Sequence, residues 1–134
     1  MKICTIQWEE TIPLRHSVLW PGESKEYCQV NDDEHGLHFG TFIDDVIVCV
    51  ASIYLTEDRA RLRKFATDAA FQNQGIGTKM LGHIVQTLSR NHVKFLRCDA
   101  RESALGLYKR FGMSQNSDRF YKGNVAYFKM EVAL

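Results

Sequence analysis

The chain has 134 residues, of which 45% are hydrophobic and 25% charged, and its formal net charge is +1. A chain of this length forms one domain (1–134) and buries roughly two thirds of its unfolded surface, so folding needs neither disulfides nor a metal. The balanced charge, and the lack of a long apolar run or a signal-peptide core, indicate neither a nucleic-acid nor a membrane partner, and we expect a cytoplasmic protein.

The cysteines and histidines indicate no metal site. Four cysteines lie far apart: Cys4, Cys28, Cys49 and Cys98. No C-x-x-C pair occurs, which argues against zinc. The His35–His38 spacing falls in a strand or loop, where a packed or solvated pair is the better interpretation. We therefore predict that the protein has no metal.

The N-terminal segment predicts a strand over residues 2–8 and then a helix. Thr11 is the expected helix N-cap and Pro13 lies in the first turn, where its missing N–H costs little. The helix is expected to end before Pro21-Gly22. The strand and the helix together account for the first twenty residues.

A polar loop follows over residues 23–36, with a helical turn expected around Lys25–Cys28. Asp32, Asp33 and Glu34 in this loop are interpreted as a solvated acidic segment. Attraction of a cationic amine is the alternative.

Three consecutive antiparallel strands are predicted next, over residues 37–43, 46–55 and 60–67. The middle run is almost continuously apolar. Asp44-Asp45 has the length and composition of a two-residue hairpin turn.

The stretch 71–80 follows the last of these strands and opens an amphipathic helix. Its apolar stripe is built from Ile76, Met80, Leu81, Ile84, Val85 and Leu88, and the helix is expected to end near Arg90. A strand, a glycine-bearing turn and a helix start together form an anion site, because the first N–H groups of a helix lack intrahelical partners.

The remaining segments predict a strand over 95–99, a helix over Ser103–Arg110 and a hairpin around Gly123-Asn124. A strand that follows a helix suggests a βαβ unit, so the 95–99 strand should lie parallel to the 60–67 strand. The predicted class is α+β, with a central mixed, mostly antiparallel sheet and flanking helices.

Three phosphate-binding motifs compete for the glycine turn. The P-loop is excluded because Gly77-Thr78-Lys79 has the wrong order and spacing. The dinucleotide fingerprint lacks its third glycine, since Met80 stands there. The pattern Q/R-x-x-G-x-G/A is met by Gln72, Gly75 and Gly77.

That pattern, in the context of the surrounding elements, resembles the GNAT superfamily of N-acetyltransferases. The similar segments are 14–22, Phe65–Gly77, Asp99–Met113 and Val125–Met130. The resemblance implies the GNAT fold with splayed strands, acetyl-CoA as cosubstrate, and direct acetyl transfer to a primary amine through a tetrahedral intermediate. A homodimer is an arrangement that the family allows.

The resemblance also implies roles for individual residues. The residues implied in cofactor binding are Phe65, Ala66, Thr67, Gln72, Asn73, Gln74, Gly75, Ile76, Gly77, Thr78 and Lys109. Arg110, like Lys109, could reach the phosphates of the cofactor; the alternative is that the two are solvated charges at a helix end. Tyr108 would be the general acid that protonates the leaving thiolate.

The general base and the acceptor are less defined. Arg61 stands where histone-type relatives carry a glutamate, which leaves a water relay, Glu102, Asp99 or His38 as base. Cys98 as a nucleophile is a minor alternative. The acceptor, a small-molecule or peptide amine, would meet residues of the first helix, the 23–36 loop and the closing hairpin. The candidates are Arg15, Trp20, His38 and Tyr127.

Two other functions compete with the enzyme. One is a non-catalytic acyl-CoA-binding sensor or regulatory module, and the other is a generic nucleotide-binding domain. The tyrosine and the intact glycine loop favour the enzyme.

Overall fold

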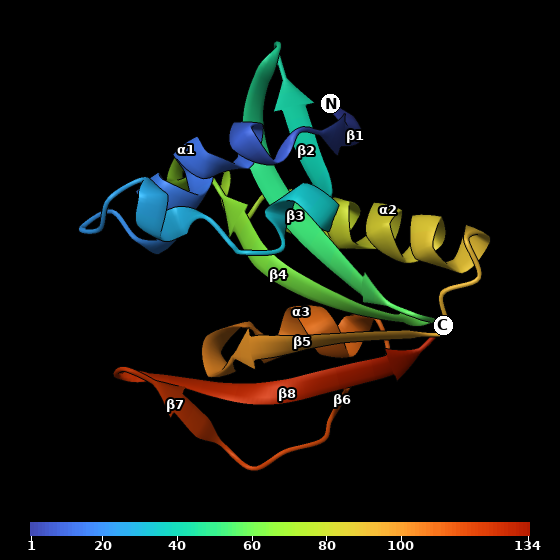
Figure 1. The fold of residues 1–134 in the computed structure, drawn as a ribbon. Helices are drawn as coiled ribbons and strands as arrows, with labels where there is room; N and C mark the ends of the chain where they lie inside the picture. Colours follow the sequence, from blue (N-terminus) through green and yellow to red (C-terminus); the bar gives the residue numbers. More distant parts are fainter.

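A computed structural model describes residues 1–134 as an eight-stranded sheet flanked by helices (Figure 1). The strands are β1 (Lys2–Ile6), β2 (Leu37–Ile43), β3 (Val46–Thr56), β4 (Arg59–Thr67), β5 (Phe95–Arg101), β6 (Ser114–Gln115), β7 (Phe120–Lys122) and β8 (Val125–Ala133). The α-helices are α1 (Ile12–Leu14), α2 (Ile76–Arg90) and α3 (Leu105–Arg110). The predicted α+β class is confirmed.

The sheet has the strand order β1-β2-β3-β4-β5-β8-β6, and β7 pairs with β8. Neighbouring strands are antiparallel except β4 and β5, which are parallel. Helix α2 causes this exception, because it returns the chain from the end of β4 to the start of β5. The predicted βαβ unit is therefore confirmed.

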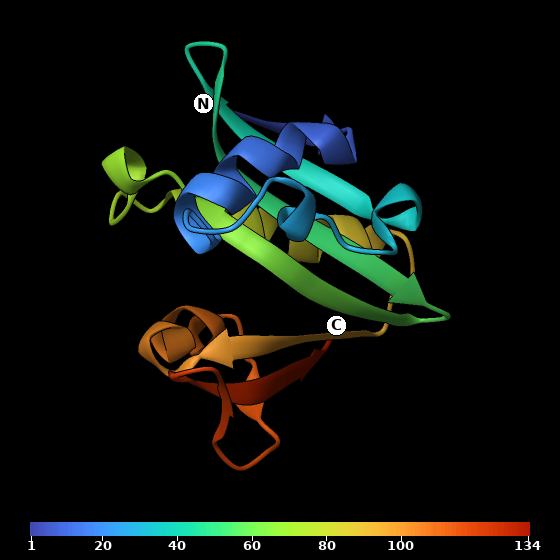
Figure 2. The ribbon, with the colours of Figure 1, turned by 60° about the vertical axis from the view of Figure 1, so that its left-hand side comes forward.

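Strands β4 and β5 separate part of the way along their length. Their pairing covers only Arg59–Leu62 against Phe95–Cys98. Beyond that point β4 continues beside β3 and β5 continues beside β8, so the two strands diverge (Figures 1 and 2). The splayed strands expected from the family resemblance are present, and they leave one edge of β4 without a partner strand.

A β-bulge lies on β4 where the strands separate. Val50 pairs with Ala66 and Ser52 pairs with Arg63, so Ala51 alone faces two residues of β4. One of these two is Lys64, whose φ is 55°. A bulge of this kind bends a strand and re-aims its side chains. Here it coincides with the start of the splay.

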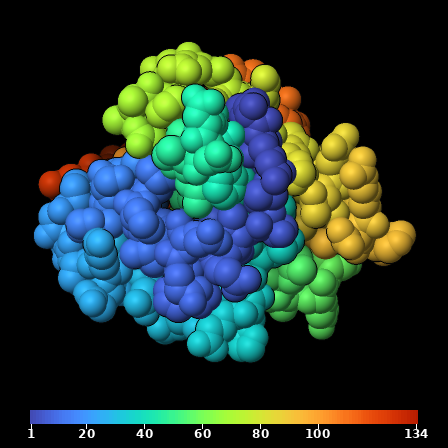
Figure 3. Space-filling view, turned by 90° about the horizontal axis from the view of Figure 1, so that it is seen from above, coloured from blue at the N-terminus to red at the C-terminus, as the bar shows by residue number.

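The sheet is covered on both faces. On one face lies α2, whose Ile76, Met80, Leu81, Ile84 and Leu88 are buried as predicted. Leu14 packs on Val50 and Ala66 in a separate small cluster. Side chains that alternate along a strand point to opposite faces, so the N-terminal segment covers the other side of the sheet. Figure 3 shows this segment in blue across the middle of the view.

The first helical segment begins earlier than predicted. A 3₁₀ turn over Trp8–Thr11 leads into α1, and a π-helical turn over Arg15–Leu19 ends the segment. Gln7 caps it, and its N–H donates to the carboxylate of Glu10 at 2.8 Å. Thr11 is the N-cap residue of α1, as predicted, but its side chain makes no capping bond, because the Thr11 hydroxyl donates backward to the Trp8 carbonyl at 2.6 Å. The first strand accordingly ends at Ile6.

The other predicted strands and helices are present in the structure. The sequence did not indicate the short strand β6. The turn at Asp44-Asp45 has φ values of 50° and 64°, as a two-residue hairpin requires. None of the helices is both long enough and apolar enough to cross a lipid bilayer.

Candidate active site

The glycine loop exposes backbone donors at the start of α2. Gly75 has a φ of 81° and precedes the helix. The first bond of the helix runs from the N–H of Lys79 to the carbonyl of Gly75 at 3.1 Å. The N–H groups of Ile76, Gly77 and Thr78 therefore have no intrahelical partner. Together with the helix dipole they form an anion-binding geometry.

A cavity of about 830 Å³ lies against this loop. The predicted cofactor residues that line it are Phe65, Ala66, Thr67, Gln72, Asn73, Gly75, Ile76, Gly77 and Thr78. Gln74 and Lys109 do not line it, whereas Arg110 does. The side-chain amide of Gln74 instead donates to the Ala70 carbonyl at 3.3 Å.

Two side chains shape the loop that leads into α2. Asp68 accepts a hydrogen bond from the N–H of Ala70 at 2.9 Å and so caps the 3₁₀ turn Ala69–Phe71. The side-chain amide of Gln72 donates to the Thr67 carbonyl at 3.0 Å. Gln72 thus fixes the loop against the end of β4 as well as lining the cavity.

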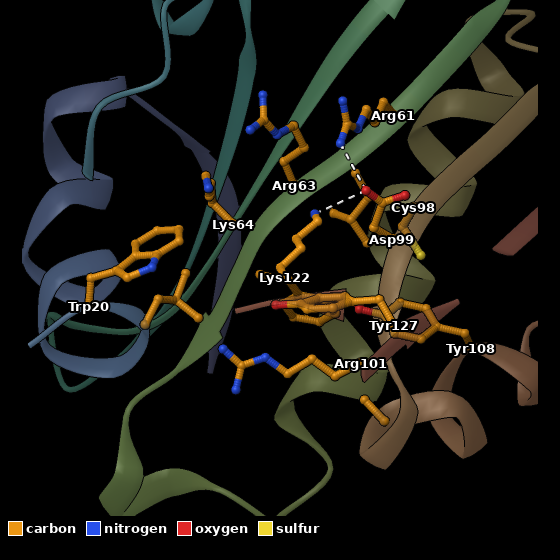
Figure 4. Close-up of a pocket in the computed structure, with 14 residues that line it drawn as sticks. Trp20, Arg61, Arg63, Lys64, Cys98, Asp99, Arg101, Tyr108, Lys122 and Tyr127 are labelled. Carbon is orange, nitrogen blue, oxygen red and sulfur yellow. Dashed lines mark hydrogen bonds and ion pairs between the residues drawn. The ribbon is translucent and has the colours of Figure 1, made fainter. Parts of the chain in front are cut away.

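A second cavity, of about 220 Å³, lies between Trp20, the splayed parts of β4 and β5, and the β7–β8 hairpin (Figure 4). The two cavities share five lining residues: Leu19, Phe65, Arg101, Ala104 and Tyr108. They therefore meet at the splay, and Tyr108 lies at their junction.

Tyr108 is nearly buried, with 8% of its surface exposed, and its hydroxyl makes no hydrogen bond within the chain. Burial, with the nearby Cys98, raises the pKa of the phenol above its ordinary value. The hydroxyl thus stays protonated at neutral pH and can act as a donor at the junction.

Cys98 lines the smaller cavity from β5. Burial is the main cause that raises the pKa of its thiol to about 12. A nucleophilic cysteine reacts as the thiolate, so this environment argues against a covalent route through Cys98.

The smaller cavity is rich in positive charge. Its lining contains five cations, Arg61, Arg63, Lys64, Arg101 and Lys122, and one carboxylate, that of Asp99. Asp99 pairs with Arg61 at 3.2 Å and with Lys122 at 3.0 Å. Burial of Asp99 alone would raise the pKa of its carboxyl, but Lys122 and Arg61 outweigh burial and lower it.

Lys64 is the most perturbed of these cations. Its ammonium lies 4.0 Å from the centre of the Trp20 ring. Burial, followed by repulsion from neighbouring cations, of which Arg63 contributes most, lowers the pKa of Lys64 to about 8. Burial and the neighbouring cations thus disfavour the charged form of an amine at this position in the cavity.

Of the four predicted acceptor residues, Trp20 and Tyr127 line the smaller cavity, while Arg15 and His38 line neither cavity. Arg15 is fully buried and pairs with Asp33 at 2.8 Å. The ring of His38 is hydrogen-bonded to the Ser52 hydroxyl at 2.6 Å and to the Asp33 carbonyl at 2.8 Å. Arg15 and His38 are therefore removed from the acceptor set.

The acidic segment also differs from its prediction. Asp33 is buried rather than solvated, and besides Arg15 it accepts a hydrogen bond from the Tyr54 hydroxyl at 2.6 Å. Asp32 and Glu34 are exposed. No part of the 23–36 loop lines either cavity.

Among the candidate bases, Glu102 also lies outside both cavities, and it pairs with the exposed Arg119 at 2.6 Å. Asp99 is the remaining carboxylate. The residues that the sequence interpretation missed are Arg63, Lys64 and Lys122. The run Arg61-Leu62-Arg63-Lys64 was a signal for a basic strand, but only the bulge brings Lys64 into the cavity wall.

Comparisons with known proteins agree with this geometry. A family model described as an acetyltransferase (GNAT) domain matches residues 16–134. YitI, an uncharacterized N-acetyltransferase of Bacillus subtilis (strain 168), is 31% identical over 129 residues, which cover 90% of this chain and 87% of that protein. The ribosomal protein bS18-alanine N-acetyltransferase of Escherichia coli (strain K12) is 27% identical over 103 residues, which cover 75% of this chain and 69% of that protein.

The fold is shared with a solved structure. The crystal structure of the ribosomal-protein-S18-alanine N-acetyltransferase from Escherichia coli matches with a TM-score of 0.85 at 20% identity. The match covers 98% of this chain and 92% of that one.

Proposed function

Because the chain belongs to the GNAT family of N-acetyltransferases, we propose that it transfers the acetyl group of acetyl-CoA to a primary amine. The observation that carries the proposal is the junction of the two cavities at Tyr108. One cavity has anion-binding donors and the volume of a cofactor site, and the other is small and lined by five cations. Relatives of this chain include an enzyme named for acetylating an alanine of ribosomal protein bS18.

The larger cavity fits acetyl-CoA. The free N–H groups of Ile76, Gly77 and Thr78 would bind the pyrophosphate. The edge of β4 that β5 leaves unpaired would bind the pantetheine amides as an added strand does, along Phe65–Thr67. When bound, acetyl-CoA supplies an acetyl group activated as a thioester.

The smaller cavity would present the acceptor amine in its neutral form, which is the nucleophile. An alkylamine in water has a pKa of about 10.4 and is mostly charged at neutral pH. Lys64 is itself an amine in this cavity, and its pKa is lowered to about 8. The same burial and positive charge would act on an acceptor amine beside it, so its proton could leave to water.

An acceptor amine with a lowered pKa loses its proton to water, so the reaction needs no strong general base. The two cations that pair with Asp99 hold the pKa of its carboxyl low, which makes Asp99 a weak base. Glu102 and His38 are outside the cavities. A water relay is therefore the route that we propose for the proton.

Tyr108 would donate a hydrogen bond or its proton to the departing thiolate. No hydrogen bond within the chain occupies its hydroxyl, and its raised pKa keeps the phenol protonated, so that it can donate a hydrogen bond to the thiolate. It is the one phenol that lines both cavities.

The test is the substitution Tyr108→Phe in an assay of thiol release from acetyl-CoA with a panel of amines. We expect kcat to fall by roughly 100-fold or more, since a positioned general acid contributes about that much. The affinity for CoA, measured by titration calorimetry, should change less than about twofold, because the ring and its packing remain.

The matched control is Tyr121→Phe, which removes an exposed phenol outside both cavities. It should leave kcat unchanged. Tight CoA binding by the native chain without thiol release on any amine would favour the non-catalytic sensor instead. Unchanged kcat in Tyr108→Phe would remove the tyrosine from the mechanism.

A further inference from the structure

We infer that the acceptor of this chain is a small amine that also carries an anionic group, a carboxylate or a phosphate, held by the basic cluster of the smaller cavity. The basic cluster is Arg61, Arg63, Lys64 and Lys122. The inference rests on the proposed function, and it names the substrate class of that same site.

The basic cluster carries more positive charge than the one carboxylate in the cavity, that of Asp99, can neutralise. The carboxylate of Asp99 is shared between Arg61 and Lys122. Arg63 and Lys64 have no carboxylate partner; each lies near an aromatic ring, at 6.0 Å from Tyr54 and 4.0 Å from Trp20 respectively. Figure 4 shows these two side chains on the wall opposite Lys122 and Tyr127. Two cations therefore face the cavity without an anion.

The cofactor does not account for this charge. All four members of the basic cluster line the smaller cavity and none lines the larger one. The cations of the larger cavity are Arg101 and Arg110. The anionic part of CoA belongs at the start of α2, so a different anion must match the basic cluster.

The basic cluster is also partly desolvated, which favours an anionic ligand over water. Burial is the first cause that lowers the pKa of both Arg63 and Lys64, and mutual repulsion adds to it. The Nε of Arg61 is buried and has no hydrogen-bond partner. A bound carboxylate or phosphate would pair with these cations through charge-assisted hydrogen bonds, and a neutral or cationic amine would leave the repulsion in place.

The size of the cavity favours a small molecule over a peptide. Its volume is about 220 Å³. At ~30 Å³ per water molecule in the liquid, it holds about seven waters, enough for a short amino acid or a phosphorylated alkylamine.

The test compares amines that differ by one anionic group. β-Alanine is paired with propylamine, and phosphoethanolamine with ethanolamine; a short peptide with two N-terminal aspartates is the fifth probe. Thiol release from acetyl-CoA gives kcat/KM, and calorimetric titration of the CoA-saturated protein gives Kd without chemistry. We expect at least one anionic probe to exceed its neutral partner by about tenfold or more in both readouts.

Substitutions in the basic cluster test whether its residues cause the preference for anionic amines. Arg63→Gln and Lys64→Gln should each reduce the ratio of kcat/KM for the anionic probe to kcat/KM for its neutral partner by about tenfold. Arg63→Glu should reverse the preference. Arg90→Gln, which removes an exposed charge at the end of α2 outside both cavities, is the control and should change neither value. Raising the salt from about 0.05 M to about 0.5 M should reduce the advantage of the anionic probe.

The outcomes separate the inference from the proposed function. Turnover of neutral amines with equal efficiency, unaffected by the Arg63 and Lys64 variants, overturns the inference and leaves the acetyltransferase intact. Absence of thiol release with every amine contradicts the proposed function, and the titrations still decide whether the basic cluster binds anionic amines. A preference for the acidic peptide over both small anionic amines also overturns the inference, because the acceptor is then a protein N-terminus. The ratio between β-alanine and phosphoethanolamine distinguishes carboxylate from phosphate.

Discussion

Gly75 and Gly77 lie two residues apart and meet different requirements. Gly75 has a φ of 81° with open space where a Cβ would be, so its requirement is conformational. Gly77 follows it in the helix, and a Cβ there would lie 3.6 Å from the Phe65 ring, an ordinary contact. Only the first glycine is therefore needed to build the turn that exposes the backbone donors of α2.

The two glycines give opposite stability predictions. Gly75→Ala should lower the free energy of unfolding by about 1 kcal/mol, because a Cβ disfavours the left-handed region. Gly77→Ala should leave stability unchanged or raise it by about 0.5 kcal/mol, because alanine is the better helix former. Urea unfolding of both variants measures the difference. Equal losses would mean that the turn does not depend on the conformation of Gly75.

At the scale of elements, a buried ion pair joins the helical segment to the sheet. Arg15 donates to Asp33 at 2.8 and 3.0 Å and to the Ser52 hydroxyl of β3 at 2.9 Å. Asp33 also accepts the N–H of Val30 at 2.8 Å. The 23–36 loop thus closes over the N-terminal segment, and this segment carries Trp20 to the smaller cavity.

Breaking this pair should be costly. Asp33→Asn leaves Arg15 buried without a counter-charge, and we expect unfolding to become easier by about 3 kcal/mol at neutral pH. Asp32→Asn, a change of the exposed neighbouring acid, is the matched control and should cost less than about 0.5 kcal/mol. Chemical denaturation at pH 7 measures both. Similar small losses in the two variants would show that the pair does not hold the loop.

The same pair predicts an acid dependence. Burial would raise the pKa of Asp33, but hydrogen bonds from Arg15, Tyr54 and Val30 outweigh it, and the pKa is lowered. A carboxyl with a lowered pKa in the folded state adds stability above its unfolded value, near ~3.9, and loses it as the pH falls below about 4. The native chain should therefore lose more stability than Asp33→Asn between about pH 5 and pH 3.

At the scale of the whole molecule, charge is distributed unevenly. The net charge of +1 is nearly neutral, yet five cations and one carboxylate line the smaller cavity. The splay of β4 from β5, the β4 bulge and the β7–β8 hairpin bring these charges to one place. A local positive potential can therefore form in a chain whose composition indicates no charged ligand.

This potential predicts a pH dependence of catalysis. The neutral amine is the nucleophile, so kcat should rise with pH through the pKa of the bound amine and level off above it. Because burial and neighbouring cations lower the pKa of Lys64 in the same cavity, we expect the midpoint of kcat to lie below the solution pKa of the amine. Lys64→Gln removes one repelling charge and should move the midpoint upward. A profile of kcat from about pH 6 to about pH 10 tests this, and a midpoint that stays at the solution pKa of the amine would contradict it.

Much of the fold could be predicted because its signals are local. The stripe of α2, the turn at Asp44-Asp45, the β4–α2–β5 unit and the glycine turn each follow from patterns in one continuous stretch of sequence, and all are present. Most of the predicted cofactor residues line the larger cavity for the same reason, since one continuous strand–turn–helix carries them.

Tertiary structure decided most of the acceptor side, where only Trp20 and Tyr127 of the predicted residues line the smaller cavity. Arg15 and Asp33 are 18 residues apart, and their pairing buries Arg15, which was predicted to contact the acceptor, together with Asp33, which was predicted to be solvated. Lys122 and Asp99 meet because β5 and β7 both pair with β8, and Lys64 joins them because a bulge turns β4. Desolvation and Coulomb energy depend on distance in space rather than along the chain. The sequence by itself therefore determined the elements and the glycine turn at the start of α2, and only the folded arrangement made the smaller cavity cationic.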